Sequence, residues 1–251
     1  MIRYFVILLI NIKTQFMNKG KLYLIPSPLG ETAFEHLFPP FNSTLIHSLD
    51  YFIVEEFKTG RRFIKKMGMP KPIDQLHLFL LNEHTRTKEV EALLEPLLSG
   101  FNMGLLSEAG TPCVADPGSL VVNKAQQMGI EVIPLIGPNS ILLALMGSGL
   151  NGQKFAFNGY LNRDRKLREK ELKFYESLVF KTDQTQIFIE APYRNNHFFE
   201  SMMEVCSPEL KICLGVDLTT DQQLLKTRTV SQWRKEKIDL HKRPTVFLMG
   251  K

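Results

Sequence analysis

Cysteine is scarce in this sequence. Only Cys113, Cys206 and Cys213 occur among 251 residues, and no two of them have the CxxC spacing. An odd number without that spacing indicates neither a disulfide framework nor a zinc site. The six histidines are scattered, and the spacing of His77 and His84 is not one that metal ligands favour. We therefore expect no metal ion, and a reducing cytoplasm as the compartment.

Motifs that mark common enzyme classes are also absent. The sequence has no GxGxxG and no GxxxxGK[ST], which argues against ordinary dinucleotide and P-loop nucleotide binding. It has no HExxH and no GxSxG, the marks of zinc proteases and α/β-hydrolases. If the chain is an enzyme, an organic cofactor is expected rather than a metal.

Long apolar runs are missing. The apolar stretch from Tyr4 to Ile10 lies between Arg3 and Lys13 and is far shorter than the roughly 20 residues that span a bilayer. No small-residue cleavage site follows it, so it does not resemble a signal peptide. We expect residues 1–19 to form an N-terminal tail with no membrane role, and Met17 is the alternative start of the protein.

The composition that is present is typical of a folded domain. Hydrophobic residues make up 44% of the chain and charged residues 23%. Basic residues number 31 against 26 acidic residues, a net charge of +5. This balance tolerates an anionic partner such as RNA but does not demonstrate one.

Strands alternate with helices along the first part of the sequence, which predicts an α/β fold with a parallel sheet covered by helices. The pattern changes after Gly152, and small, turn-forming residues gather between Ser148 and Gly152. The sequence therefore predicts two α/β domains, residues 20–150 and residues 151–251.

The stretch from Met103 to Gly118, MGLLSEAGTPCVADPG, is the most informative part of the chain. A short apolar run predicts a buried strand, a turn rich in glycine and proline follows, and a helical pattern then resumes. Strand, glycine-bearing loop and helix is the way in which α/β sheets present backbone groups to small ligands. A second loop of this kind, IGPNS, ends at Ser140, so we expect one shared pocket.

Several separated segments resemble one family. SEAGTPCVADPG is similar to the SDAGTP…SDPG segment of the bacterial small-subunit rRNA ribose-2′-O-methyltransferases, which share the tetrapyrrole-methylase fold. Further similar segments follow in the family's order over roughly residues 20–220. They are LYLIPSPLGE, IPLIGPNSILLALMGSGL, FAFNGYLNR and IFIEAPYR.

The resemblance implies a two-domain tetrapyrrole-methylase-like fold, with S-adenosylmethionine in the interdomain cleft and a homodimer as the assembly. Glycine in such a loop lets backbone amides approach a ligand carboxylate, and a serine at a helix start offers a hydroxyl. Carried over position by position, the cofactor residues are Leu29, Ala109, Gly110, Thr111, Val114, Ser140, Ile141, Glu190 and Thr219.

The chain also departs from the family pattern. The family's EDTR segment reads Glu55, Glu56, Phe57 and Lys58 here, and the aspartate that opens its DAGTP segment is Glu108. The departures fall on the substrate side more than in the cofactor loops, so methyl transfer is expected and the particular ribose stays open.

Acidic residues near the expected cleft are candidates for the catalytic base that accepts the ribose proton. These are Glu56, Glu108 and Asp116, with Glu190 also considered, and the sequence does not rank them. For each, a cap, loop or salt-bridge role is an equal alternative.

Basic residues supply candidates for substrate binding, of which Lys58, Arg62 and Arg194 are expected to contact it. A basic segment from Arg163 to Lys170 suits either RNA phosphates or a solvated helix face. Cys113 is expected to pack as a small apolar residue.

The sequence thus predicts an S-adenosylmethionine-dependent methyltransferase that acts on rRNA or another structured RNA at a ribose 2′-oxygen. Two alternatives stay open. One is a methyltransferase for a tetrapyrrole or other small molecule, and the other is a catalytically impaired, cofactor-binding RNA-associated protein.

Overall fold

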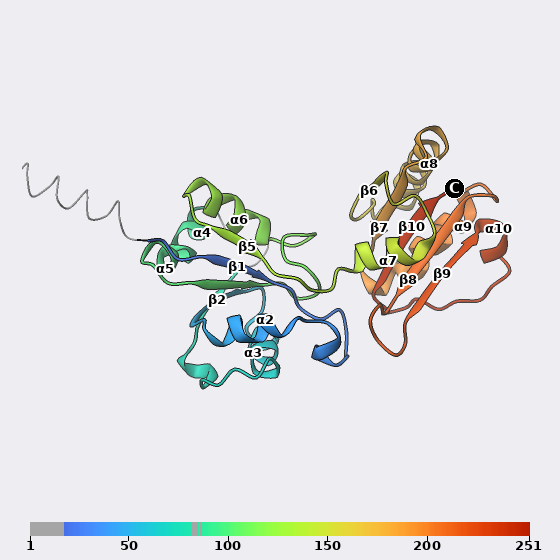
Figure 1. The fold of residues 1–251 in the computed structure, drawn as a ribbon. Coiled ribbons are helices and arrows are strands. Elements are labelled where there is room, and N and C mark those ends of the chain that lie inside the picture. Colours follow the sequence, from blue (N-terminus) through green and yellow to red (C-terminus); the bar gives the residue numbers. More distant parts are fainter. Residues whose placement is uncertain (1–17, 82–84, 86) are drawn as a thin grey trace, which may run out of the picture. The chain divides into compact units, whose positions relative to one another are not determined.

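The computed structural model describes residues 18–81, 85 and 87–251 (Figure 1). The predicted N-terminal tail up to Met17, and His84, lie outside these residues. Contacts divide the chain into two compact units. The first runs to Pro28 and from Ala33 to Pro138, and the second holds Leu29–Thr32 and Asn139–Lys251.

The first unit is built on a five-stranded sheet in the order β3-β2-β4-β1-β5. Every neighbouring pair in it is parallel, as the alternation of strands and helices predicted. The strands are β1 (Leu22–Ile25), β2 (Tyr51–Val54), β3 (His77–Leu80), β4 (Met103–Leu106) and β5 (Val132–Pro134).

Helices cover both faces of this sheet (Figure 1). One apolar core lies under α4, α5 and α6, and a second lies under α2, α3 and the short 3₁₀ helices η1 and η2. Their bounds are η1 (Phe34–His36), α2 (Pro40–His47), α3 (Phe57–Lys66), η2 (Ile73–Gln75), α4 (Thr87–Leu93), α5 (Glu95–Leu98) and α6 (Gly118–Gln127).

Strand β4 lies at the centre of the sheet and is buried along its whole length. A strand that is covered on both faces carries a continuous apolar run, which is why MGLL was recognisable from the sequence. Gly104 is required there, because a Cβ at this position would come within 2.6 Å of Ile25 Cδ1 and 2.9 Å of Phe52 Cδ1.

The second unit has a mixed five-stranded sheet in the order β6-β7-β10-β8-β9. Strands β6 and β7 are parallel, and the other pairs are antiparallel. The strands are β6 (Phe155–Phe157), β7 (Thr185–Ile189), β8 (Lys211–Val216), β9 (Leu224–Thr229) and β10 (Thr245–Gly250).

The helices of the second unit also lie on both faces of its sheet. Helices α8, α9 and α10 cover a core around Phe188, Phe198, Trp233 and Phe247, and α7 covers the opposite core (Figure 1). The helices are α7 (Ser140–Ser148), α8 (Arg165–Thr182), the 3₁₀ helix η3 (Pro192–Arg194), α9 (Asn195–Val205) and α10 (Val230–Trp233).

Two features of the second unit were not evident from the sequence. Strand β9, LLKTRT, is half polar and pairs only with β8, so its sequence lacks the apolar run of a central strand. Helix α7 packs against β8, β9 and β10, and Gly147 allows Leu225 to come close to it. The contacts therefore group α7 with the second unit, while the domain limits at residues 150 and 151 stay a prediction.

Candidate active site

A hydrogen-bonded bridge joins the loops that follow β1 and β4. Ser27 and Gly110 exchange backbone hydrogen bonds of 2.9 and 3.0 Å, and the Ser107 hydroxyl donates to the Gly110 carbonyl at 2.6 Å. Gly110 has a φ of +74°, a conformation that suits glycine. Because β1 and β4 are neighbouring parallel strands, the bridge lies at their carboxyl ends, where α/β sheets bind ligands.

The loop after β4 is held by the carboxylate of Asp116. It accepts hydrogen bonds from the backbone N–H of Cys113 at 2.8 and 2.9 Å and from that of Gly118 at 2.7 Å. Burial raises the pKa of Asp116, although these two hydrogen bonds act in the opposite direction. The structure thus gives this catalytic candidate a role in shaping the loop.

Two non-glycine residues of the same loop have left-handed backbones, Cys113 with φ 68° and Ala115 with φ 64°. Such residues are uncommon and concentrate where a loop conformation serves function. Burial, followed by the charge of Asp116, raises the pKa of the Cys113 thiol to about 12. The thiol therefore stays protonated and packs beside the core, as expected from the sequence.

The carboxylate of Glu56 is the N-cap of α3. It accepts the Thr59 backbone N–H at 2.8 Å, and backbone hydrogen bonds from Lys58 and Thr59 lower its pKa. The cap alternative that the sequence left open for Glu56 therefore describes what its side chain does here.

Glu55 is the acidic residue that faces the β4 loop, and it was not among the candidates chosen from the sequence. Its carboxylate accepts the backbone N–H of Glu108 at 3.1 Å. Burial is the main cause that raises the pKa of Glu55, and the charges of Asp116 and Glu108 add to it. The only available signal was its position directly after the buried strand β2.

Glu108 itself is exposed, and its carboxylate accepts the Thr59 hydroxyl at 2.5 Å. Glu55, Glu108 and Asp116 thus gather at the carboxyl ends of β2 and β4.

The predicted cofactor residues of the first unit all lie in the β4 loop. Gly110 is buried, Thr111 is half-buried, and Ala109 and Val114 are exposed. Lys58 and Arg62, predicted to contact substrate, are exposed one helical turn apart on α3 of the same unit.

The other predicted cofactor residues lie in the second unit. Leu29 and Ile141 belong to one apolar cluster, which also contains Leu218. Thr219 follows Leu218 with a φ of 72°, and its hydroxyl oxygen is buried without a hydrogen-bond partner among the described residues. Ser140 is the first residue of α7, and the preceding Asn139 supplies the cap by accepting the Leu142 N–H at 2.9 Å.

Glu190 pairs with Arg194 at the end of β7. Its side chain is 2% exposed, and it accepts the Ala191 N–H at 2.6 Å as well as a hydrogen bond from the Arg194 guanidinium. Both partners are within four residues of Glu190 along the chain, so this ion pair fixes the EAPYR segment locally.

No group of three or more His, Cys, Asp and Glu side chains is arranged to hold a metal ion in the part of the chain that the structure describes. No described helix combines the length and apolar character that crossing a bilayer requires.

Comparison with known proteins decides the family. No family model matches the chain. The ribosomal RNA small subunit methyltransferase I of Bacillus subtilis (strain 168) is 31% identical over 215 residues, which cover 86% of this chain and 69% of that protein. The chain belongs to the ribosomal RNA small subunit methyltransferase I family.

Other relatives of the same name agree. The protein of Synechocystis sp. is 33% identical over 200 residues, 80% of this chain and 67% of that protein. The protein of Vibrio cholerae is 30% identical over 198 residues, and the match spans 79% of this chain and 65% of the relative. The family resemblance predicted from the motifs is confirmed, and the chain is a methyltransferase whose methyl donor is S-adenosylmethionine.

Solved structures confirm the predicted fold. The methyltransferase CobJ matches with a TM-score of 0.62 at 18% identity, over 92% of this chain and 94% of that one. Diphthine synthase matches with a TM-score of 0.64 at 15% identity, over 90% and 88% of the two chains. At these identities the likeness establishes the tetrapyrrole-methylase fold and leaves the substrate to other arguments.

Proposed function

We propose that this chain transfers a methyl group from S-adenosylmethionine to a ribose 2′-oxygen of ribosomal RNA. The observation that carries the proposal is the sequence match to relatives named ribosomal RNA small subunit methyltransferase I along most of the chain. The excess of basic residues, 31 against 26 acidic, suits an RNA partner.

The residues present fit the cofactor. Gly110 leaves the β4 loop open to backbone contacts, and the unpartnered, buried hydroxyl of Thr219 is a polar atom that a ligand would satisfy. We assign cofactor binding, in a cleft between the two domains as the resemblance implies, to nine residues. They are Leu29, Ala109, Gly110, Thr111, Val114, Ser140, Ile141, Glu190 and Thr219.

The chain's own groups must orient the ribose and accept its proton. When bound, S-adenosylmethionine supplies an electrophilic methyl group. A ribose hydroxyl that takes up this methyl group would lose its proton, so a side chain of the protein would have to accept that proton. Alignment of the reacting groups contributes about 7 to 11 kcal/mol in favourable cases.

We assign the proton acceptor to Glu55. Among the acidic residues at this edge of the sheet, Glu56 caps a helix and Asp116 holds a loop. The Glu55 carboxylate accepts one hydrogen bond and has a raised pKa, which brings it closer to the range of an effective general base. Glu108 lies beside it and stays an alternative acceptor.

We further propose that Lys58, Arg62 and Arg194 contact the RNA backbone, that the protein acts in the cytoplasm, and that it is a homodimer. The ribosomal RNA in the relatives' names and the absence of disulfide spacing support the compartment. The family resemblance supports the dimer.

Two measurements test the proposed function. Calorimetric titration with S-adenosylmethionine is expected to show saturable binding. A titration without binding would contradict methyl transfer from this cofactor to any substrate. Ribose-methylation mapping of ribosomal RNA from a strain that lacks the gene is expected to lose one 2′-O-methyl group. An unchanged map, with cofactor binding intact, would favour a small-molecule substrate or an impaired enzyme instead.

A further inference from the structure

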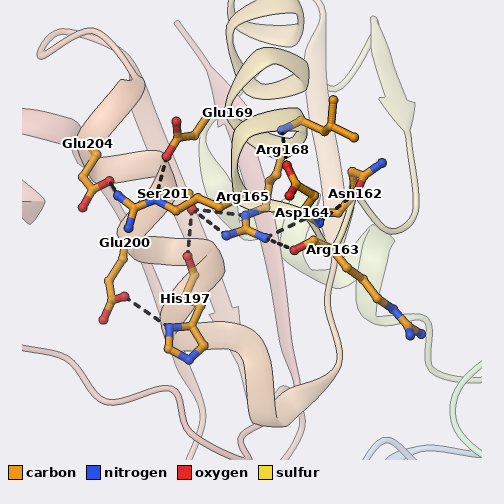
Figure 2. A network of polar contacts seen from close by, with 11 residues as sticks. Asn162, Arg163, Asp164, Arg165, Arg168, Glu169, His197, Glu200, Ser201 and Glu204 are labelled. Carbon is orange, nitrogen blue, oxygen red and sulfur yellow. Dashed lines mark hydrogen bonds and ion pairs between the residues drawn. The ribbon is translucent and has the colours of Figure 1, made fainter.

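A basic cavity of about 260 Å³ lies in the second unit between the start of α8 and helix α9. Four arginines line it against two glutamates, and Figure 2 shows the polar contacts that join the two helices there. The residues are Arg163, Arg165, Arg168, Arg194, Glu190 and Glu200.

Arg168 is a buried cation held only by neutral groups. The residue is 8% exposed, and its guanidinium donates to the Ser201 hydroxyl at 3.1 and 3.0 Å. It also donates to the Arg163 carbonyl at 3.0 Å (Figure 2). Among the described residues no carboxylate lies within 4.0 Å of its nitrogens to form an ion pair. A buried arginine is ordinarily paired with an acid, so the cavity holds positive charge that an anion would balance.

The acidic groups nearby do not cancel this charge. Glu190 is occupied by Arg194 and the Ala191 N–H, and Glu200 lies 3.4 Å from His197. The Arg194 Nε atom is buried and has no hydrogen-bond partner among the described residues, which leaves a donor for a ligand.

The two other arginines of the first cavity, Arg163 and Arg165, differ in how firmly other side chains hold them. Arg165 is tied to Glu169 and Glu204, whereas Arg163 is exposed and Figure 2 draws no bond to its guanidinium. Arg163 can therefore turn toward a ligand at the cost of side-chain entropy alone.

A second cavity, of about 360 Å³, shares Arg163 and Arg194 with the first. Tyr160 and Tyr193 line it, and they are 57% and 60% exposed. The Arg194 guanidinium carbon lies 5.7 Å from the centre of the Tyr193 ring. Exposed aromatic rings beside arginines are the arrangement on which proteins stack unpaired bases.

The sheet explains why these residues meet. Strands β6 and β7 are parallel, and the Ile189 N–H donates to the Gly159 carbonyl at 3.1 Å just beyond β6. The FAFNGYLNR and IFIEAPYR segments therefore leave the sheet side by side and place Tyr160 near Tyr193 and Arg194.

We propose that the two cavities together bind one unpaired nucleotide of the RNA substrate. Its phosphate lies among Arg163, Arg168 and Arg194, and its base stacks on Tyr193. The inference rests on the proposed function for the identity of the RNA, and it adds a binding site in the second unit.

The test measures binding of a fluorescein-labelled, unstructured RNA of about ten nucleotides to the full chain by anisotropy, without cofactor and over a series of salt concentrations. Arg163→Gln is expected to weaken binding about tenfold and to lower the slope of log affinity against log salt by about 0.7, the value for one lost phosphate contact. Lys170→Gln is the matched control, since Lys170 is an exposed cation of α8 outside the cavities.

Loss of the stacking contact is expected to change RNA affinity without changing its salt dependence, unlike loss of a phosphate contact. Tyr193→Ala is expected to weaken binding about 5- to 150-fold with the salt slope unchanged, and Tyr193→Phe to retain it. Arg168→Lys keeps the buried charge but loses the forked donor, so it is expected to weaken binding.

Two results would overturn the inference. One is an Arg163→Gln affinity and slope equal to those of Lys170→Gln, and the other is a Tyr193→Ala affinity equal to that of the wild type. Failure of the proposed function is a separate outcome, because methylation mapping of ribosomal RNA does not depend on this oligonucleotide. An unchanged methylation map with the predicted binding losses would refute the target and retain the site.

Discussion

Glu55 is the residue whose position most affects the proposed chemistry. Because its carboxylate faces Glu108 and Asp116 from a half-buried position, we expect Glu55→Gln to lower kcat about 10²- to 10⁴-fold, the usual contribution of a general base. The Gln side chain keeps an acceptor oxygen for the Glu108 backbone N–H. Calorimetry should therefore find the same S-adenosylmethionine affinity as in the wild type. Glu35→Gln, which removes an exposed acid in the same unit, is the control. Full activity of Glu55→Gln would move the assignment to Glu108.

The same substitution has a predicted effect on stability. The pKa of Glu55 is raised above its ordinary value of 4.5, so the folded state binds this proton more tightly than the unfolded chain. The stability that this tighter proton binding contributes is fully present below the ordinary pKa of Glu55. It is lost as the pH rises through the raised pKa of the folded state. Glu55→Gln should therefore raise the thermal midpoint at about pH 7 and lose this advantage below about pH 4. A gain that is equal at both pH values would contradict this explanation.

The roles of individual side chains were the part of the candidate site that could least be predicted from the sequence. Two adjacent glutamates follow β2, and only the folded backbone determines that Glu56 turns to cap α3 while Glu55 faces the β4 loop. The basic run before and within α8 was equally ambiguous. Folding buries Arg168 and leaves Lys166 and Lys170 exposed, a difference that depends on the packing of α9.

At the scale of elements, apolar runs and turn residues predicted the central strands and the loops between them. β4 and the glycine-bearing loop after it were recognisable because both faces of the strand are buried. β9 was missed because it is an edge strand whose residues are half polar, so it lacks the apolar run of a central strand, although it pairs with the strand that precedes it, β8.

The loop between β4 and α6 provides a prediction for an element. Asp116→Ala would leave the Cys113 and Gly118 N–H groups without their acceptor, which costs about 1 to 3 kcal/mol when such groups stay buried. The left-handed backbones of Cys113 and Ala115 would lose their support at the same time. We expect a loss of S-adenosylmethionine affinity in calorimetry that exceeds the loss for Asp74→Ala, an exposed acid of the same unit. Equal affinities for the two variants would show that the loop does not contact the cofactor.

At the scale of the whole molecule, the proposed cofactor residues come from both units. The β4 loop belongs to the first unit, and Leu29, Ile141 and Thr219 belong to the second. A ligand that binds only the folded state stabilises it by about 2.7 kcal/mol at a hundred times its Kd, and it protects the backbone that it touches. We therefore expect S-adenosylmethionine to slow amide hydrogen exchange both in residues 109–114 and around Thr219.

The variant Thr219→Val sharpens that experiment. It removes a buried hydroxyl that has no partner among the described residues, so the chain without ligand should become more stable while cofactor affinity falls. In this variant, protection of residues 109–114 should require more S-adenosylmethionine than in the wild type if, as we propose, the cofactor residues of the two units bind the same molecule. Protection confined to the first unit, with Thr219→Val binding as tightly as the wild type, would remove the second unit from the cofactor site. The RNA site proposed at Arg163 and Tyr193 would then be the only ligand role left to that unit.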